Sequence, residues 1–182
     1  SNDGPEIEQL SGMLQGMIRN NERDLIESKL KLLLAQTEEN KGNVKGTMLL
    51  YQAGEKLSGE GSSLKLQHQL GQVRTLINNG QLDEASQLMK QLAGQFRSKN
   101  AFDIGMYMLA KSEFYLQTQK LDNLDVILKK AGAGFSQSQN LIWKAYSIKC
   151  YGDACRYNND IPKAKAYYAK SELFYKQAHH PF

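Results

Sequence analysis

Apolar residues recur at helical spacing through most of the chain. In residues 6–19 they fall at Ile7, Leu10, Leu14 and Met17, which predicts an amphipathic helix. Asn20-Asn21 is expected to end it, and the alternative is a continuous run into the next helix. The same spacing predicts eight further helices in four pairs. Their ranges are 25–39 with 44–57, 64–78 with 82–96, 102–118 with 121–130, and 141–157 with 161–178. The run Ala131-Gly132-Ala133-Gly134 is expected to end the helix that begins at 121.

The clearest helix pair ends in the stretch N-N-D-I-P-K-A-K-A-Y-Y-A-K-S, residues 158–171. Asn159 suits a left-handed turn, Asp160 can cap the following helix, and Pro162 fits its first turn. Ala164, Tyr168 and Ser171 then share one face at helical spacing. The stretch therefore predicts a tight turn followed by a helix that packs closely on its neighbour.

This pattern repeats along the chain. The positions equivalent to Ala164 are Thr47, Ala85 and Leu124, at intervals of 38, 39 and 40 residues. The positions four and seven residues later are Tyr51 and Gly54, Met89 and Leu92, Leu128 and Ala131, and Tyr168 and Ser171. Twelve residues earlier lie Ala35, Val73, Ser112 and Gly152, and five earlier lie the turn positions Gly42, Gly80, Gln119 and Asn159. A period of 20–50 residues is typical of helical repeat proteins.

On these residues the chain resembles the tetratricopeptide repeat (TPR) family, in a long-repeat variety. The resemblance implies an all-α, right-handed superhelical solenoid of about four helical hairpins plus an N-terminal helix. Residues 1–20 would form a capping helix and 21–182 the repeat domain, with repeats at about 24–58, 64–98, 101–134 and 140–178. Gly152, Ala164, Tyr168 and Ser171 stand at the family's small, small, aromatic and small positions.

The resemblance also implies a groove lined by the first helix of each pair. The candidate partner-binding residues are Gln36, Arg74, Asn78, Glu113, Gln117, Tyr146, Lys149, Asp153, Arg156 and Tyr157. Arg74, Glu113, Asp153 and Arg156 form a charge row of mixed sign, which suits a protein or peptide better than nucleic acid. We expect charge reversal at Arg74 or Arg156 to weaken binding and to leave the fold intact.

Composition adds few constraints. The net charge of +4 is mild, and no apolar run reaches the roughly 18 residues that span a bilayer, so neither nucleic acid nor membrane is an expected partner. Cys150 and Cys155 lie five apart on one predicted helix, which places their thiols on different sides. Two free thiols favour a reducing compartment, and a cytoplasmic location is expected.

The sequence contains no motif for a nucleophile, a metal or a phosphate loop, and His68 has no catalytic partner at readable spacing. We therefore expect no catalytic residue, cofactor or metal site. The leading hypothesis is a non-enzymatic scaffold that binds a partner peptide or helix. The alternative is the peptide- or ligand-sensing domain of a larger transcriptional or signalling regulator. Further repeats, an effector domain in the parent chain, and a homo-oligomer all stay open.

Overall fold

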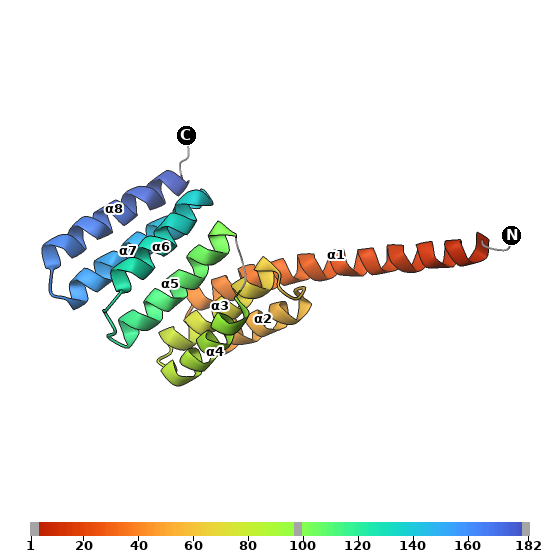
Figure 1. The fold of residues 1–182 in the computed structure, drawn as a ribbon, viewed down its shortest axis with the longest axis horizontal. Coiled ribbons are helices and arrows are strands. Elements are labelled where there is room, and N and C mark those ends of the chain that lie inside the picture. Colours follow the sequence, from red (N-terminus) through yellow and green to blue (C-terminus); the bar gives the residue numbers. More distant parts are fainter. Residues whose placement is uncertain (1–3, 97–99, 180–182) are drawn as a thin grey trace. The chain divides into compact units, whose positions relative to one another are not determined.

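The computed structural model describes the backbone of residues 4–96 and 100–179, and side chains from residue 20 to 178 outside 97–99. This part of the chain is all-helical and contains no strand (Figure 1). Its helices are α1 (Gly4–Asn40), α2 (Val44–Leu57), α3 (Ser63–Asn78), α4 (Leu82–Gln95), α5 (Ala101–Gln117), α6 (Leu124–Gln137), α7 (Leu141–Tyr157) and α8 (Ile161–His179). The apolar stripe predicted for residues 6–19 lies outside the described side chains. The predicted domain and repeat bounds at residues 1, 98 and 182 also lie outside the described residues.

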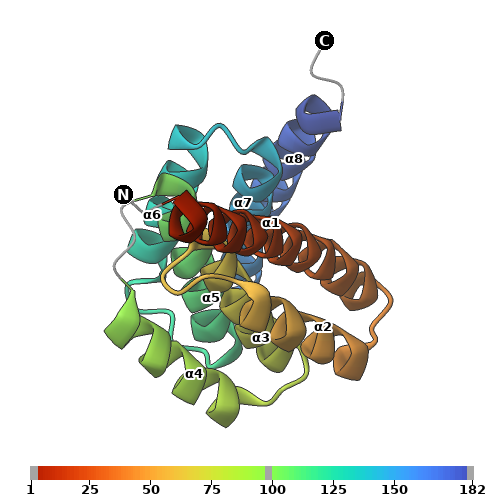
Figure 2. The same cartoon turned by 90° about the vertical axis from the view of Figure 1, so that its right-hand side faces the viewer.

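The chain divides into two units, residues 1–68 and 69–182. The N-terminal unit contains α1, α2 and the first residues of α3. Its α1 and α2 pack as a helical hairpin, and because α1 has 37 residues and α2 only 14, α2 accompanies only the C-terminal part of α1 (Figure 2). Ala35, Thr47 and Tyr51 are buried in this unit.

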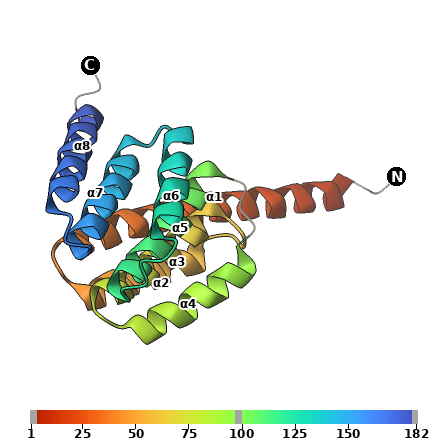
Figure 3. The same cartoon turned by 60° about the vertical axis from the view of Figure 1, so that its left-hand side comes forward.

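The C-terminal unit contains the rest of α3 and α4 to α8. Neighbouring helices pack in chain order, α5 on α6, α6 on α7 and α7 on α8, as the green to blue ribbons of Figure 3 show. Leu109, Leu128, Phe135 and Ala145 are fully buried. Side chains from successive helices therefore share one continuous core.

The four predicted turn positions all adopt left-handed backbone. The φ angles are 74° at Gly42, 76° at Gly80, 55° at Gln119 and 57° at Asn159. In each turn the next N–H donates to a carbonyl five residues earlier, as Asp160 does to Cys155 over 2.8 Å. This hydrogen bond satisfies a carbonyl at the end of the preceding helix. The turn prediction is confirmed at all four positions.

The predicted 38–40 residue repeat is also visible in burial. Of the sixteen repeat positions on the helices, fifteen are buried and Tyr168 is half-buried. A Cβ built on Gly152 would collide with the Tyr168 ring, so this glycine permits the close contact of α7 with α8. Asp160 caps α8 as expected, accepting the Lys163 N–H at 3.2 Å.

Two predicted helix ends are wrong. Asn20 and Asn21 do not end the helix, because α1 continues through them without interruption. The described residues therefore contain eight helices rather than nine. Inside a helix, asparagine costs at most about 0.7 kcal/mol relative to alanine. This penalty is too small to stop the helix from continuing.

The second error concerns α6, which runs from Leu124 to Gln137 and includes the Ala131–Gly134 run. A Cβ on Gly134 would lie 2.5 Å from the Ala101 carbonyl oxygen and 2.9 Å from the Gly105 nitrogen of α5. The glycine is therefore present because the two helix backbones approach each other closely, and not to end the helix.

Candidate functional site

A polar cavity of about 240 Å³ lies on the α3, α5 and α7 side of the C-terminal unit. Its lining residues all belong to these three helices. They are Ile77, Asn78, Glu113, Leu116, Gln117, Tyr146, Lys149, Cys150, Asp153, Arg156 and Tyr157. Eight of the ten candidate partner-binding residues are among them. The structure thus brings residues up to 80 positions apart in the sequence into one cavity.

Two of the lining residues, Glu113 and Tyr146, belong to a buried hydrogen-bonded cluster with Arg74. Arg74 Nε donates to Glu113 Oε2 at 2.8 Å, and the Tyr146 hydroxyl donates to Glu113 Oε1, also at 2.8 Å. Arg74 and Glu113 are only 9% and 8% exposed. The Arg74 guanidinium also lies 5.0 Å from the Trp143 ring centroid and 5.1 Å from that of Tyr146. Both carboxylate oxygens of Glu113 are therefore occupied, which fixes their position.

The environment holds Tyr146 in its neutral form. Burial raises its pKa strongly, and the neighbouring Glu113 carboxylate raises it further. A neutral hydroxyl is the form that can donate to Glu113. The Tyr146 hydroxyl consequently does not titrate near neutral pH.

A second, more exposed cluster forms one wall. Lys149 Nζ and the Tyr168 hydroxyl donate to the two oxygens of Asp153, each at 2.8 Å. Burial lowers the pKa of Lys149, but the hydrogen bond and charge of Asp153 outweigh it and the pKa stands above its ordinary value. The i, i+4 spacing of Lys149 and Asp153 on α7 makes this pair available locally.

The groups that remain open to solvent lie at the rim. Asn78, Gln117, Arg156 and Tyr157 are exposed. Ile77 and Leu116 add buried apolar side chains to the lining. The combination suits an extended chain that carries amides and acidic groups beside apolar side chains.

Two of the ten candidates lie elsewhere. Gln36 belongs to α1 in the N-terminal unit and does not line the cavity. Arg74 is buried, pairs with Glu113 and does not line the cavity, so we now expect reversal of its charge to harm the fold. A glutamate there would lie buried beside Glu113 with no counter-charge.

Cys150 lines the cavity and was not among the candidates. It follows Tyr146 by four residues and precedes Asp153 by three, and this spacing places it on the same face of α7. It is buried, and burial raises the pKa of its thiol, so the thiol is not activated as a nucleophile. Both cysteines are free, as their spacing predicted.

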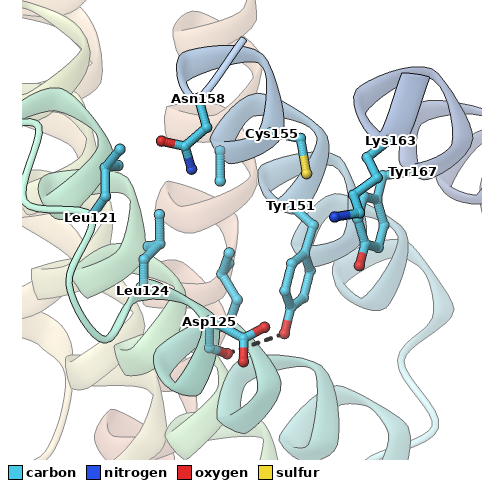
Figure 4. Close-up of a pocket in the computed structure, with 10 residues that line it drawn as sticks. Leu121, Leu124, Asp125, Tyr151, Cys155, Asn158, Lys163 and Tyr167 are labelled. Carbon is cyan, nitrogen blue, oxygen red and sulfur yellow. Dashed lines mark hydrogen bonds between the residues drawn. The ribbon is translucent and has the colours of Figure 1, made fainter. Parts of the chain in front are cut away.

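A second cavity of about 260 Å³ lies among α6, α7 and α8 (Figure 4). Leu121, Leu124, Leu128 and Ala154 supply its apolar surface, and the Tyr151 hydroxyl donates to the Asp125 carbonyl at 3.2 Å. Its ionic groups already have partners, because Asp125 pairs with Lys129 and Lys163 with Asp160. We regard the α3–α5–α7 cavity as the candidate site because its rim presents more exposed polar groups.

The structure gives His68 a partner that sequence spacing did not reveal. Its Nε2 lies 3.0 Å from Ser28 Oγ and 3.2 Å from the Ser28 carbonyl oxygen in the N-terminal unit. Both residues are fully buried, and the serine hydroxyl is within 2.9 Å of the Gly54 carbonyl. A buried serine engaged with a carbonyl has no access to substrate, so this pair has the geometry of a structural contact.

No protein-family model, curated protein or solved structure matches this chain. Within the described residues, no helix combines the length and apolar character required to cross a bilayer.

Proposed function

We propose that this chain is a non-enzymatic interaction scaffold that binds a partner peptide in the α3–α5–α7 cavity, and that its hairpins are repeats of the tetratricopeptide type. The observation that carries the proposal is that eight residues chosen from repeat spacing line one polar cavity. The common phase of the turns and buried positions supports the repeat assignment.

The chemistry of the cavity favours a peptide of mixed character. Arg156 offers an exposed cation, and Gln117 offers an exposed amide that can pair with an extended backbone. Glu113 and Asp153 place two carboxylates in the lining, and these would repel the phosphates of a nucleic acid. We therefore propose a protein partner with an acidic side chain next to apolar ones.

The test begins with peptides selected from a random display library against the full chain. Binding of a selected peptide is measured with the wild type, Arg156→Glu and Tyr157→Ala. We expect each variant to lower affinity by about tenfold, equivalent to 1.4 kcal/mol. Lys170→Glu, an exposed cation on α8, is the matched control and should leave the affinity unchanged.

Amide chemical-shift changes on adding the peptide locate its binding surface. The proposal requires the changes to concentrate in α5 and α7 around Gln117 and Arg156. Changes confined to α6 and α8 would assign binding to the second cavity, and submicromolar binding of a nucleic acid at physiological salt would contradict the proposed partner class.

A further inference from the structure

The cavity among α6, α7 and α8 is lined by aliphatic side chains and by two tyrosine rings (Figure 4). Leu128 is fully buried and Leu124 is 4% exposed, so the aliphatic part of the lining belongs to the core of the C-terminal unit. Tyr151 and Tyr167 stack with their ring centroids 5.2 Å apart and an angle of 18° between the rings. The lining therefore combines core leucines with a pair of stacked aromatic rings.

Small side chains of α7 border this cavity, at positions where the earlier hairpins carry larger ones. Ala154-Cys155 belongs to the lining. Forty residues earlier, at the equivalent places of the preceding hairpin, stands Phe114-Tyr115, and a further 39 residues earlier stands Thr75-Leu76. The smaller pair leaves room beside α6 and α8 that either larger pair would reduce. The cavity is therefore a feature of the last hairpin and not of the repeat as such.

Both charged residues of the lining already have a partner of opposite charge. Asp125 pairs with Lys129 at 2.6 Å, and Lys163 pairs with Asp160 at 3.2 Å. Burial also raises the pKa of Tyr151, so its hydroxyl stays neutral near pH 7. A charged ligand would lose hydration here without meeting an unpaired counter-charge, which is costly. The cavity consequently suits an uncharged ligand.

The volume of the cavity sets the size of that ligand. An apolar protein cavity of roughly 150 Å³ takes up benzene, and scaling from benzene gives about ten non-hydrogen atoms for the 260 Å³ of this one. We propose that the α6–α7–α8 cavity binds a small, uncharged, bicyclic aromatic molecule of the indole type. Its rings contact the leucines and the two tyrosine rings. Its N–H donates to the side-chain oxygen of Asn158, an exposed member of the lining (Figure 4).

The first test is calorimetric titration of the full 182-residue chain with indole. We expect saturable binding with a dissociation constant below about 1 mM, in the range of efficient ligands of this size. Cys155→Leu and Ala154→Phe, which copy Leu76 and Phe114 of the earlier hairpins, should each weaken binding at least tenfold. Ala169→Leu, on the exposed side of α8, is the matched control and should bind as the wild type does. Thermal melts verify that each variant is folded. A wild type that shows no saturable binding, or folded filling variants that bind indole normally, overturns the proposal.

The reactivity of Cys155 locates the ligand in the unmodified chain. Cys155 is half-buried whereas Cys150 is 2% exposed, so an alkylating reagent reacts first with Cys155 in the folded chain. Saturating indole should slow this reaction at least fivefold. Indole-3-carboxylate has the same rings with a negative charge and should bind at least tenfold more weakly than indole. A Cys155 reaction that bound indole leaves unchanged would overturn the site, and a carboxylate that binds as tightly as indole would overturn the ligand class.

Discussion

Arg74 and Arg156 were both predicted to bind a partner, but their side chains differ strongly in exposure. Arg74 is 9% exposed and pairs with Glu113 at 2.8 Å, whereas Arg156 is exposed at the cavity rim. Breaking a buried pair leaves an uncompensated charge, so Arg74→Glu should lower the free energy of unfolding by roughly 3–5 kcal/mol. Arg156→Glu should change it by less than about 0.5 kcal/mol.

Urea denaturation of the two variants measures this difference directly. Replacing the pair by Arg74→Met with Glu113→Leu removes both charges and should recover much of the loss. Equal midpoints for Arg74→Glu and the wild type would show that the ion pair has no structural role.

His68 predicts a pH-dependent stability. Its Nε2 can donate to the Ser28 carbonyl, and its Nδ1 is buried with no hydrogen-bond partner among the described residues. Protonation would bury a charge at Nδ1, and burial lowers the pKa of His68 below its ordinary 6.5. Below pH 6.5 the unfolded chain therefore binds more protons than the folded one, and stability falls as pH falls.

We expect the loss to approach about 1.4 kcal/mol per pH unit below 6.5, until the pH reaches the folded-state pKa of His68. Thermal melts between pH 7.5 and 5.5 measure it. The comparison is His68→Gln, which keeps a donor in place of Nε2 and cannot titrate. If the variant and the wild type lose the same stability across this range, His68 is not the responsible group.

At the scale of the helices, substitution by alanine is expected to change the free energy of unfolding in opposite directions at two glycines. Gly134 on α6 lies against the backbone of α5, whereas a Cβ on Gly94 of α4 would meet nothing within 4 Å. Gly134→Ala should destabilise by roughly 1–3 kcal/mol because backbone cannot move aside as a side chain can. Gly94→Ala should stabilise by up to about 1 kcal/mol through helix propensity alone. Unfolding free energies of the two variants with opposite signs are the expected result, and equal signs would contradict the close approach of α5 and α6.

The sequence by itself determined the features that depend on local backbone chemistry and on spacing. The left-handed turns at Gly42, Gly80, Gln119 and Asn159 follow from their common phase, although Gln119 has no special preference for that conformation. Burial of the repeat positions follows from the same period, because one face of each helix must leave water. The cavity residues were predictable for the same reason, since the facing sides of α3, α5 and α7 recur with the repeat.

Only the tertiary structure decided what depends on distance between helices. The glycine-rich sequence around Gly134 is typical of a helix end. In the structure the α5 backbone lies so close that only glycine fits at this position within α6. Arginine is usually a surface residue, but Arg74 lies against Glu113 and the rings of Trp143 and Tyr146. Periodicity gives the direction in which a side chain points from its own helix. How deeply that side chain is buried depends on the neighbouring helices, and their approach is set by packing across the whole unit.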